Sequence, residues 1–282
     1  MFVAVDDIGS GDVYGFTAFA TSQAGAAALR NDAAAILRQA GLACFHGCEY
    51  RPSDRPAYEQ FTRLIRQTLI KHGGFAVFQV MPRPVFNDVF RDFPERVSTT
   101  VVQRLGHPGS DVTDLMSTKA GALVWLTRFT QGVLRPPTMD VLVARDQLRD
   151  DALNTAVVVI PAGLAMQSAE LLARLGNQYA EQVFPGGPRI SNLQMVDART
   201  DPIIQAADVI GNFGMNFLKS ELRGGGGSAN ETAKATMFAD AFEGGGAIPP
   251  PARGHYSVTS QNIVATATGA GSIKFELFAV EE

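Results

Sequence analysis

The chain has 282 residues, of which 46% are hydrophobic and 18% are charged, and its formal net charge at pH 7 is −4. This composition is that of a globular protein and excludes a disordered, collagen-like or coiled-coil chain. The acidic balance argues against a protein that coats DNA through general basicity, but it is compatible with an enzyme that has a local basic groove.

An apolar run at residues 2–5, closed by Asp6 and Asp7, and a second run at residues 13–21 predict a β-hairpin. A helix at 23–39 follows, and Gly41 is typical of the residue after a helix C-terminus. The elements expected next are a helix at 56–71, a strand at 75–81, a helix at 111–132, a strand at 139–146, an apolar run at 155–163, a helix at 165–183, a strand at 190–197 and a helix at 202–222. Strands that alternate with helices indicate an α/β fold, and the hairpin indicates that its sheet is mixed.

The C-terminal part differs in composition from the rest. Glycine runs at 224–228 and 244–246 bracket a short amphipathic segment, a proline run follows at 249–251, and residues 256–280 alternate like a hairpin. Neither glycine run carries the Gly-Lys-Ser/Thr ending of a phosphate loop. We therefore expect a main domain at 1–223 and, at 224–282, a Gly/Pro-rich connector with a C-terminal hairpin appendage.

Several features predict a cytoplasmic protein with no membrane partner. The N-terminus lacks the basic segment of a secretory signal, and the longest apolar stretch, residues 156–166, is too short for a bilayer and contains Pro161. Cys44 and Cys48 are too few for a disulfide framework and fit a reducing compartment.

Carboxylates fall at the ends of expected strands, namely Asp6, Asp7, Asp146 and Asp197, and Asp208 lies in an otherwise apolar helix. Functional groups of α/β sheets collect at the carboxyl ends of strands. Converging carboxylates repel one another unless a divalent cation is shared, and Mg²⁺ or Mn²⁺ suits oxygen ligands. Taken singly, a strand-end aspartate is more often a turn or cap residue, and the local backbone or Gln205 could satisfy Asp208.

Three segments resemble a known family. VDDIG before the hairpin, FHGCEY before the helix at 56–71, and MVDARTDPIIQAADVIGNF near the end resemble motifs of the ribonuclease H-like family known as domain of unknown function 3800. The resemblance spans roughly residues 1–220. The family motif has Glu-Ser where this chain has Asp7 and Ile8, and Ser-Lys where it has Ala198 and Arg199.

This resemblance implies a ribonuclease H-like mixed sheet flanked by helices and metal-dependent phosphodiester chemistry. By it, Mg²⁺ or Mn²⁺ ligands would be Asp6, Glu49, Asp197 and Asp208, with Asp146 a further candidate. Asp7 would be a ligand or a neighbouring acid.

Two smaller patterns have competing interpretations. Cys44, His46 and Cys48 could chelate zinc, but reduced thiols packed in the core are the favoured account. His46, beside Glu49, could move a proton or be satisfied by the local backbone. Arg55, Arg63 and Arg66 could face a phosphate backbone, although a solvated helix face is more common.

The predicted function is a metal-dependent nuclease or phosphodiesterase that acts on nucleic acid, with catalytic residues Asp6, His46, Glu49, Asp197 and Asp208. The alternative is a non-catalytic ribonuclease H-like scaffold that binds a protein partner through its C-terminal appendage. Pairing of subunits through a terminal hairpin is compatible with either.

Overall fold

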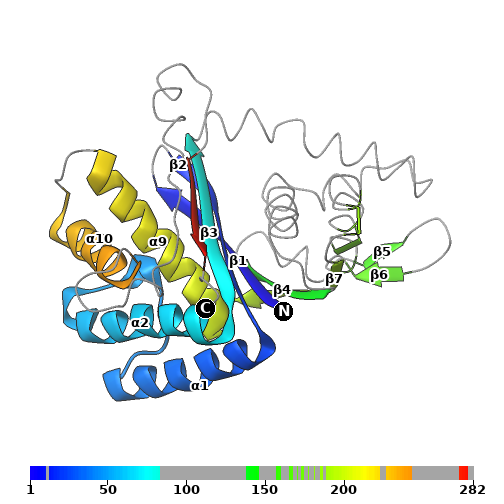
Figure 1. The fold of residues 1–282 in the computed structure, drawn as a ribbon, viewed down its shortest axis with the longest axis horizontal. Coiled ribbons are helices and arrows are strands. Elements are labelled where there is room, and N and C mark those ends of the chain that lie inside the picture. The colour runs from blue at the N-terminus through cyan, green and yellow to red at the C-terminus, as the bar shows by residue number, and fades with distance from the viewer. Residues whose placement is uncertain are drawn as a thin grey trace.

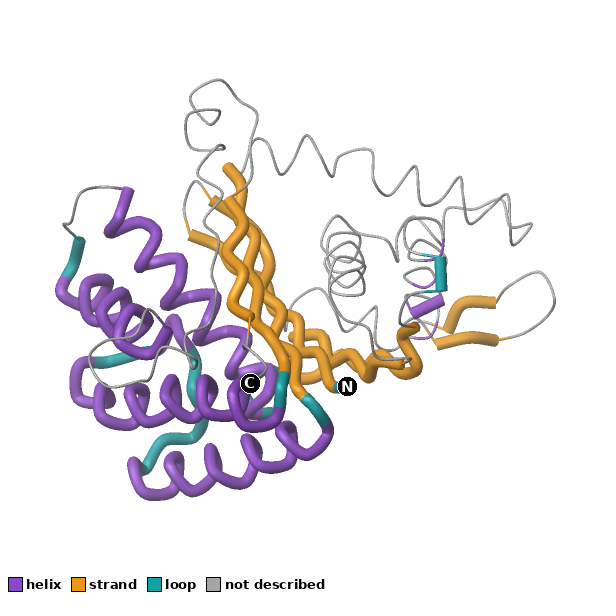
Figure 2. The backbone as a smooth tube through the Cα atoms, in the orientation of Figure 1, coloured by secondary structure: helices purple, strands orange, loops and turns teal. Residues whose placement is uncertain are grey.

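The computed structural model describes residues 1–10, 13–82, 138–145, 157–159, 165–167, 170, 173–174, 177, 181, 185–186, 189–222, 227–242 and 273–278. In chain order its elements are β1 (Phe2–Ser10), β2 (Val13–Thr21), α1 (Gln23–Ala40), η1 (Gly47–Glu49), η2 (Pro52–Asp54), α2 (Arg55–His72), β3 (Gly74–Pro82), β4 (Thr138–Arg145), β5 (Val157–Val159), β6 (Ala165–Gln167), β7 (Arg189–Asp197), α9 (Pro202–Leu222), α10 (Ala229–Phe242) and β8 (Ile273–Phe278). Helices α1, α2, α9 and α10 gather on one side of the larger sheet (Figures 1 and 2).

The larger sheet of the described part is mixed and has the strand order β7-β4-β1-β2-β3-β8. Strand β1 pairs antiparallel with β2 and parallel with β4, and β4 pairs parallel with β7. The carboxyl ends of β1, β4 and β7 therefore meet at one edge of the sheet. The predicted α/β class, the hairpin and the mixed sheet flanked by helices are confirmed.

Strand β1 is longer than the sequence predicts. It continues to Ser10, and Asp6 pairs with Thr17 inside the ladder instead of following the strand. Because side chains alternate along a strand, Asp6 shares the helix-facing side of β1 with Ala4 and Ile8, which belong to the core under the helices. Asp7 points to the other side of the sheet.

Local signals position the helices next to this sheet. The Ser22 hydroxyl accepts a hydrogen bond from Gly25 N at 3.1 Å and begins α1, and Gly41 ends it with a φ of 67°. Helix α9 approaches the hairpin very closely at Gly211, where an added Cβ would lie 2.1 Å from Thr17 Oγ1 and 2.7 Å from Ile8 Cδ1. Glycine at this position thus sets the spacing between α9 and the sheet.

The segment after Leu222 contributes to the same core. Helix α10 begins with a reciprocal cap, in which Ser228 N donates to Glu231 Oε2 at 2.8 Å and Glu231 N donates to Ser228 Oγ at 3.2 Å. Its buried Phe238 packs against Phe217 of α9, and β8 pairs with β3 as the last strand of the sheet. Helix α10 and β8 thus pack on elements of the expected main domain. The division into a main domain at 1–223 and an appendage at 224–282 remains a prediction, and most of the expected hairpin lies outside the described residues.

The structure differs from the sequence prediction at residues 165–167. The helix predicted from residue 165 is wrong at its start, because Ala165–Gln167 form β6 and pair antiparallel with β5. Residues 170, 173, 174, 177 and 181 are helical, in agreement with the rest of that prediction. The helix expected at 111–132 and the candidate ligand Asp146 lie outside the described residues.

Candidate functional site

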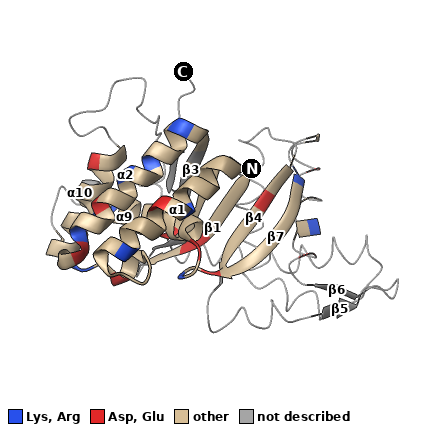
Figure 3. Cartoon of the chain, turned by 90° about the horizontal axis from the view of Figure 1, so that it is seen from below, with Lys and Arg blue, Asp and Glu red and all other residues tan. Residues whose placement is uncertain are grey.

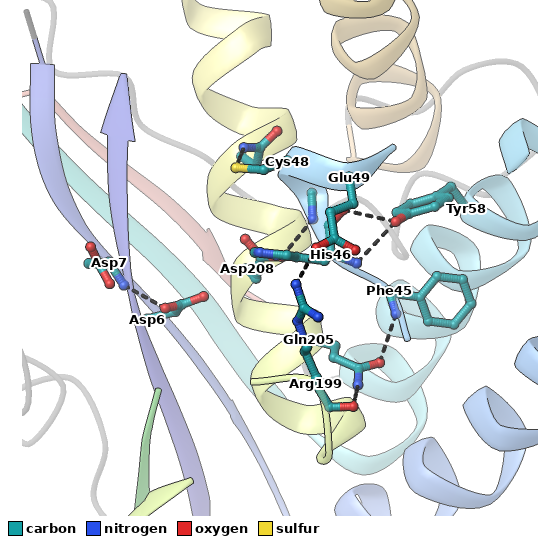
Figure 4. A network of polar contacts seen from close by, with 12 residues as sticks. Asp6, Asp7, Phe45, His46, Cys48, Glu49, Tyr58, Arg199, Gln205 and Asp208 are labelled. Atoms are coloured by element: carbon teal, nitrogen blue, oxygen red, sulfur yellow. Dashed lines mark hydrogen bonds and ion pairs between the residues drawn. The ribbon is translucent and has the colours of Figure 1, made fainter. Parts of the chain in front are cut away.

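A polar stripe runs along the otherwise apolar helix α9. Gln205, Asp208 and Asn212 are spaced by three and four residues, so they share one face of the helix. All three contact the connector that runs from Phe45 into η1. Helix α9 therefore holds this connector through polar contacts (Figure 4).

Asp208 is the centre of these contacts and is only 7% exposed. Its Oδ2 accepts a hydrogen bond from the backbone N of Gly47 at 2.6 Å and lies 2.7 Å from Nδ1 of His46. Gly47 permits this approach, since an added Cβ there would lie 2.5 Å from Asn212 Cβ. Within the described part of the chain, Oδ1 of Asp208 has no hydrogen-bond partner, so half of this carboxylate remains available to a ligand.

Neighbouring side chains fix the backbone of the connector on both sides of His46. Gln205 accepts from Phe45 N at 3.1 Å and donates to Arg199 O at 3.0 Å. The Tyr58 hydroxyl accepts from His46 N at 3.0 Å and donates to His46 O at 2.9 Å. Burial is the main cause of the raised pKa of Tyr58, which therefore stays a neutral donor.

His46 and Asp208 form a carboxylate–imidazole pair. The hydrogen bond to Asp208 is the largest influence on the pKa of His46 and raises it above the ordinary value of 6.5. Because Nδ1 is engaged, Nε2 is the ring nitrogen left for other contacts, and the side chain is 31% exposed. Such a pair can store or relay a proton.

Asp6 is the second buried carboxylate on the helix-facing side of the sheet, with 8% of its surface exposed. One of its oxygens accepts from Asp7 N at 2.8 Å. Figure 4 shows the Asp6 side chain on the side of β1 that faces α9 and Asp208, with Asp7 directed to the opposite side. The close packing at Gly211 brings β1 and α9 together next to these two carboxylates.

The other carboxylates of the sequence prediction are positioned differently. Glu49, 52% exposed as a side chain, forms an ion pair with Arg199. Asp197 stabilises the turn after β7 by accepting from Arg199 N at 2.9 Å. Within the described residues, no three His, Cys, Asp or Glu side chains come together in a way that would hold a metal ion.

The cysteines are free thiols, and Cys48 is exposed, which contradicts the expectation that both thiols pack in the core. Cys48 Sγ accepts a hydrogen bond from Asn212 Nδ2 at 3.3 Å, and Asn212 Oδ1 accepts one from Lys234 Nζ at 3.1 Å. Partial burial and then the charge of Asp208 raise the pKa of Cys48; Lys234 lowers it and Asp6 raises it. The thiol thus lies among two carboxylates and an ammonium group.

Arg55 and Arg63 agree with the favoured expectation of a solvated helix face, and Arg66 does not. Arg55 and Arg63 both pair with Glu59, and Arg66 is buried and donates to Ala241 O at 2.5 Å at the end of α10. Acidic and basic residues are interspersed over α1, α2 and α10 (Figure 3).

Sequence reasoning did not single out Tyr58, Asn212 or Lys234. The i, i+7 spacing of Gln205 and Asn212 about Asp208 was a usable signal for Asn212. Tyr58 lies on α2, 12 residues after His46, and Lys234 lies on the distant α10, but no local sequence pattern connects either of them with the connector.

Comparison with known proteins adds little. No family model matches the sequence, so membership of domain of unknown function 3800 stays a prediction, and no curated protein matches either. Among solved structures, a chain of the PCNA:RNase HII complex from Archaeoglobus fulgidus aligns with 86% of this chain and 89% of its own length, at 15% identity and a TM-score of 0.31. A TM-score this low does not establish a common fold. Among the helices of the described residues, none has the length and apolar character needed to cross a membrane.

Proposed function

We propose that this chain is a ribonuclease H-like phosphodiesterase that acts on nucleic acid with a divalent cation bound between Asp6 and Asp208. The observation that carries the proposal is that two buried carboxylates occupy facing elements, β1 and α9, on the helix side of the sheet. Burying a carboxylate costs several kcal/mol unless its charge is compensated, and a cation shared by the two would supply part of that compensation.

The fold is consistent with the resemblance on which the proposal also rests. A mixed sheet flanked by helices, an acid on the first strand and an acid on a late helix all agree with what the family motifs imply. The departures from the motif at Asp7, Ile8, Ala198 and Arg199 do not remove either acid.

The two carboxylates also fit Mg²⁺ or Mn²⁺ chemically. Mg²⁺ keeps several of its waters and is commonly bound by one or two carboxylates together with substrate phosphates, so a full protein cage is unnecessary. Oδ1 of Asp208, which has no partner in the described part, would be the ligand atom on α9. A bound cation would supply charge stabilisation at the scissile phosphate and an activated water.

The chain's own residues would then position the reacting groups. The bond from Gly47 N and the contact with His46 fix the orientation of Asp208. Nε2 of His46, on the partly exposed side of the ring, is the group that could give or take a proton at the substrate.

Metal binding tests the proposal directly. Mn²⁺ at about 100 times its dissociation constant should stabilise the folded chain by about 2.7 kcal/mol, which corresponds to a rise in melting temperature of roughly 5 °C or more. Asp6→Asn and Asp208→Asn should each abolish the rise. Asp32→Asn, which makes the same charge change on the exposed face of α1, should retain it. A wild-type melting temperature that saturating Mn²⁺ leaves unchanged would refute the metal site.

A non-catalytic ribonuclease H-like scaffold is the second candidate, and one observation favours it. Asp208 already has two partners in His46 and Gly47, and these alone can account for a buried carboxylate at this position. This candidate predicts that Asp208 fixes the position of the connector and does not bind a metal. The same titration separates the two candidates, because only the phosphodiesterase requires the Mn²⁺-dependent shift.

A further inference from the structure

Lys234 of α10 reaches across to α9 beside the two buried carboxylates. Its Nζ donates to Asn212 Oδ1 at 3.1 Å and lies 6.0 Å from the centre of the Tyr50 ring. Asn212 in turn donates to Cys48, so the lysine is linked to the connector that Asp208 holds. These contacts fix a flexible side chain in one place.

The positive charge of Lys234 is not neutralised by a neighbouring acid. Within the described residues no carboxylate lies within ion-pair distance of its Nζ, and its hydrogen-bond partner is a neutral amide. An ammonium group has three donors, so two remain for a ligand. Burial has the largest influence on the pKa of Lys234 and lowers it, while the charges of Asp208 and Glu231 raise it without forming an ion pair.

The lysine belongs to the same region as the carboxylates. Asp208 and Asn212 are one turn apart on α9, a rise of about 6 Å along the helix axis. The charges of Asp208, Lys234 and Asp6 all act on the pKa of the Cys48 thiol, whose partial burial has the largest influence. The Lys234–Asn212–Cys48 contacts therefore place the ammonium group one helical turn from Asp208, in the region where the two carboxylates could hold a metal.

We propose that Lys234 binds a non-bridging phosphate oxygen of a nucleic-acid strand whose scissile phosphate lies at the Asp6–Asp208 site. This inference rests on the proposed function and adds to it the residue that orients the backbone of the substrate. Lysine binds phosphate as a point charge, without base selectivity, so the contact serves single strands of any sequence. It also supplies a local positive charge in a chain whose net charge is negative.

Oligonucleotide binding in EDTA tests the contact without any metal. The probe is a fluorescein-labelled single-stranded DNA, with the RNA of the same sequence in parallel, and anisotropy is followed over a series of salt concentrations. Lys234→Met should weaken binding about tenfold and lower the slope of log K against log salt by roughly 0.7, the value for one phosphate contact on a single strand. Lys234→Arg should retain most of the wild-type affinity and most of the wild-type salt slope.

The matched control is Lys71→Met, which removes a charge from the exposed last turn of α2. It should leave the slope unchanged. An unaltered slope in Lys234→Met, or no binding by the wild type at low salt, would overturn the inference.

A separate measurement distinguishes this inference from the proposed function. Mn²⁺-dependent cleavage of the same oligonucleotide reports on the metal site, and Lys234→Met should raise KM more than it lowers kcat. Binding that depends on Lys234 without any cleavage would contradict the phosphodiesterase and leave the phosphate contact standing. If the chain cleaves the oligonucleotide but Lys234→Met binds it as tightly as the wild type, the phosphate contact alone is contradicted.

Discussion

Gly211→Ala should push α9 away from the hairpin and so disturb both stability and the carboxylate pair. The new Cβ would lie 2.1 Å from Thr17 Oγ1 and 2.7 Å from Ile8 Cδ1, where ordinary contacts begin at 3.4 Å. Thr17 is fully buried and β-branched, so its side chain has little freedom to rotate away. Relief of the clash therefore requires a movement of α9 by roughly 1 Å.

Two opposing contributions set the magnitude. Alanine stabilises a helix interior by about 1 kcal/mol relative to glycine, while overpacking a core costs about 1–3 kcal/mol. Because both clashing distances lie below 3.0 Å and the backbone on both sides is fixed by core packing, the cost belongs to the upper part of this range, and the free energy of unfolding should fall by about 1–2 kcal/mol. The affinity for Mn²⁺ should fall as well, since Asp6 and Asp208 lie on the two elements that are forced apart.

Urea denaturation followed by circular dichroism measures the stability term. Thr17→Ala removes the nearest clashing atom. The double variant should therefore lose about 1 kcal/mol less unfolding free energy than the two single variants lose together. A Gly211→Ala chain as stable as the wild type, or additive changes in the double variant, would show that α9 does not pack on the hairpin at this distance.

Two further predictions follow from single contacts. Arg66→Met should lower the free energy of unfolding by about 2 kcal/mol in urea denaturation, because Ala241 O loses its buried donor at the end of α10; Arg63→Met, on the exposed face of α2, should change it by less than about 0.5 kcal/mol. In EDTA, the Asp208 contact raises the pKa of His46, so its stabilising contribution should be complete below pH 6.5 and should be lost as the pH rises through the raised value. The NMR titration of the His46 ring should shift toward 6.5 in Asp208→Asn, and an unchanged midpoint would contradict the assignment.

Most of the fold could be predicted because its signals are local. Gly41 and Gly73 end helices with positive φ, and two apolar runs separated by a turn predicted the hairpin of β1 and β2. The failure at residues 165–167 has a local cause too, since a short apolar run is compatible with a helix or a strand, and pairing with β5 decides in favour of the strand. The length of β1 was underestimated because an aspartate pair reads as a strand end.

The site was predicted less well because its contacts are distant in the chain. Asp208 was singled out as unusual in an apolar helix, and the partners expected for it were a metal, the local backbone or Gln205. Gln205 instead binds Phe45 N, and the group facing Asp208 is His46, 162 residues earlier. Periodicity places a side chain on a face of a helix but does not identify what the fold brings against that face.

The charge of residue 208, more than its shape, is what separates the two candidate functions. An asparagine at this position could still accept the hydrogen bond from Gly47 N, so anchoring the connector does not by itself require an ionised group. A buried carboxylate costs free energy, and a partly exposed histidine compensates for it only while the ring is protonated. Once the ring is deprotonated, a divalent ion bound through Oδ1 of Asp208, which has no partner in the described part of the chain, would replace the lost compensation, whereas a non-catalytic scaffold would leave Asp208 with its contacts to Gly47 and His46 alone.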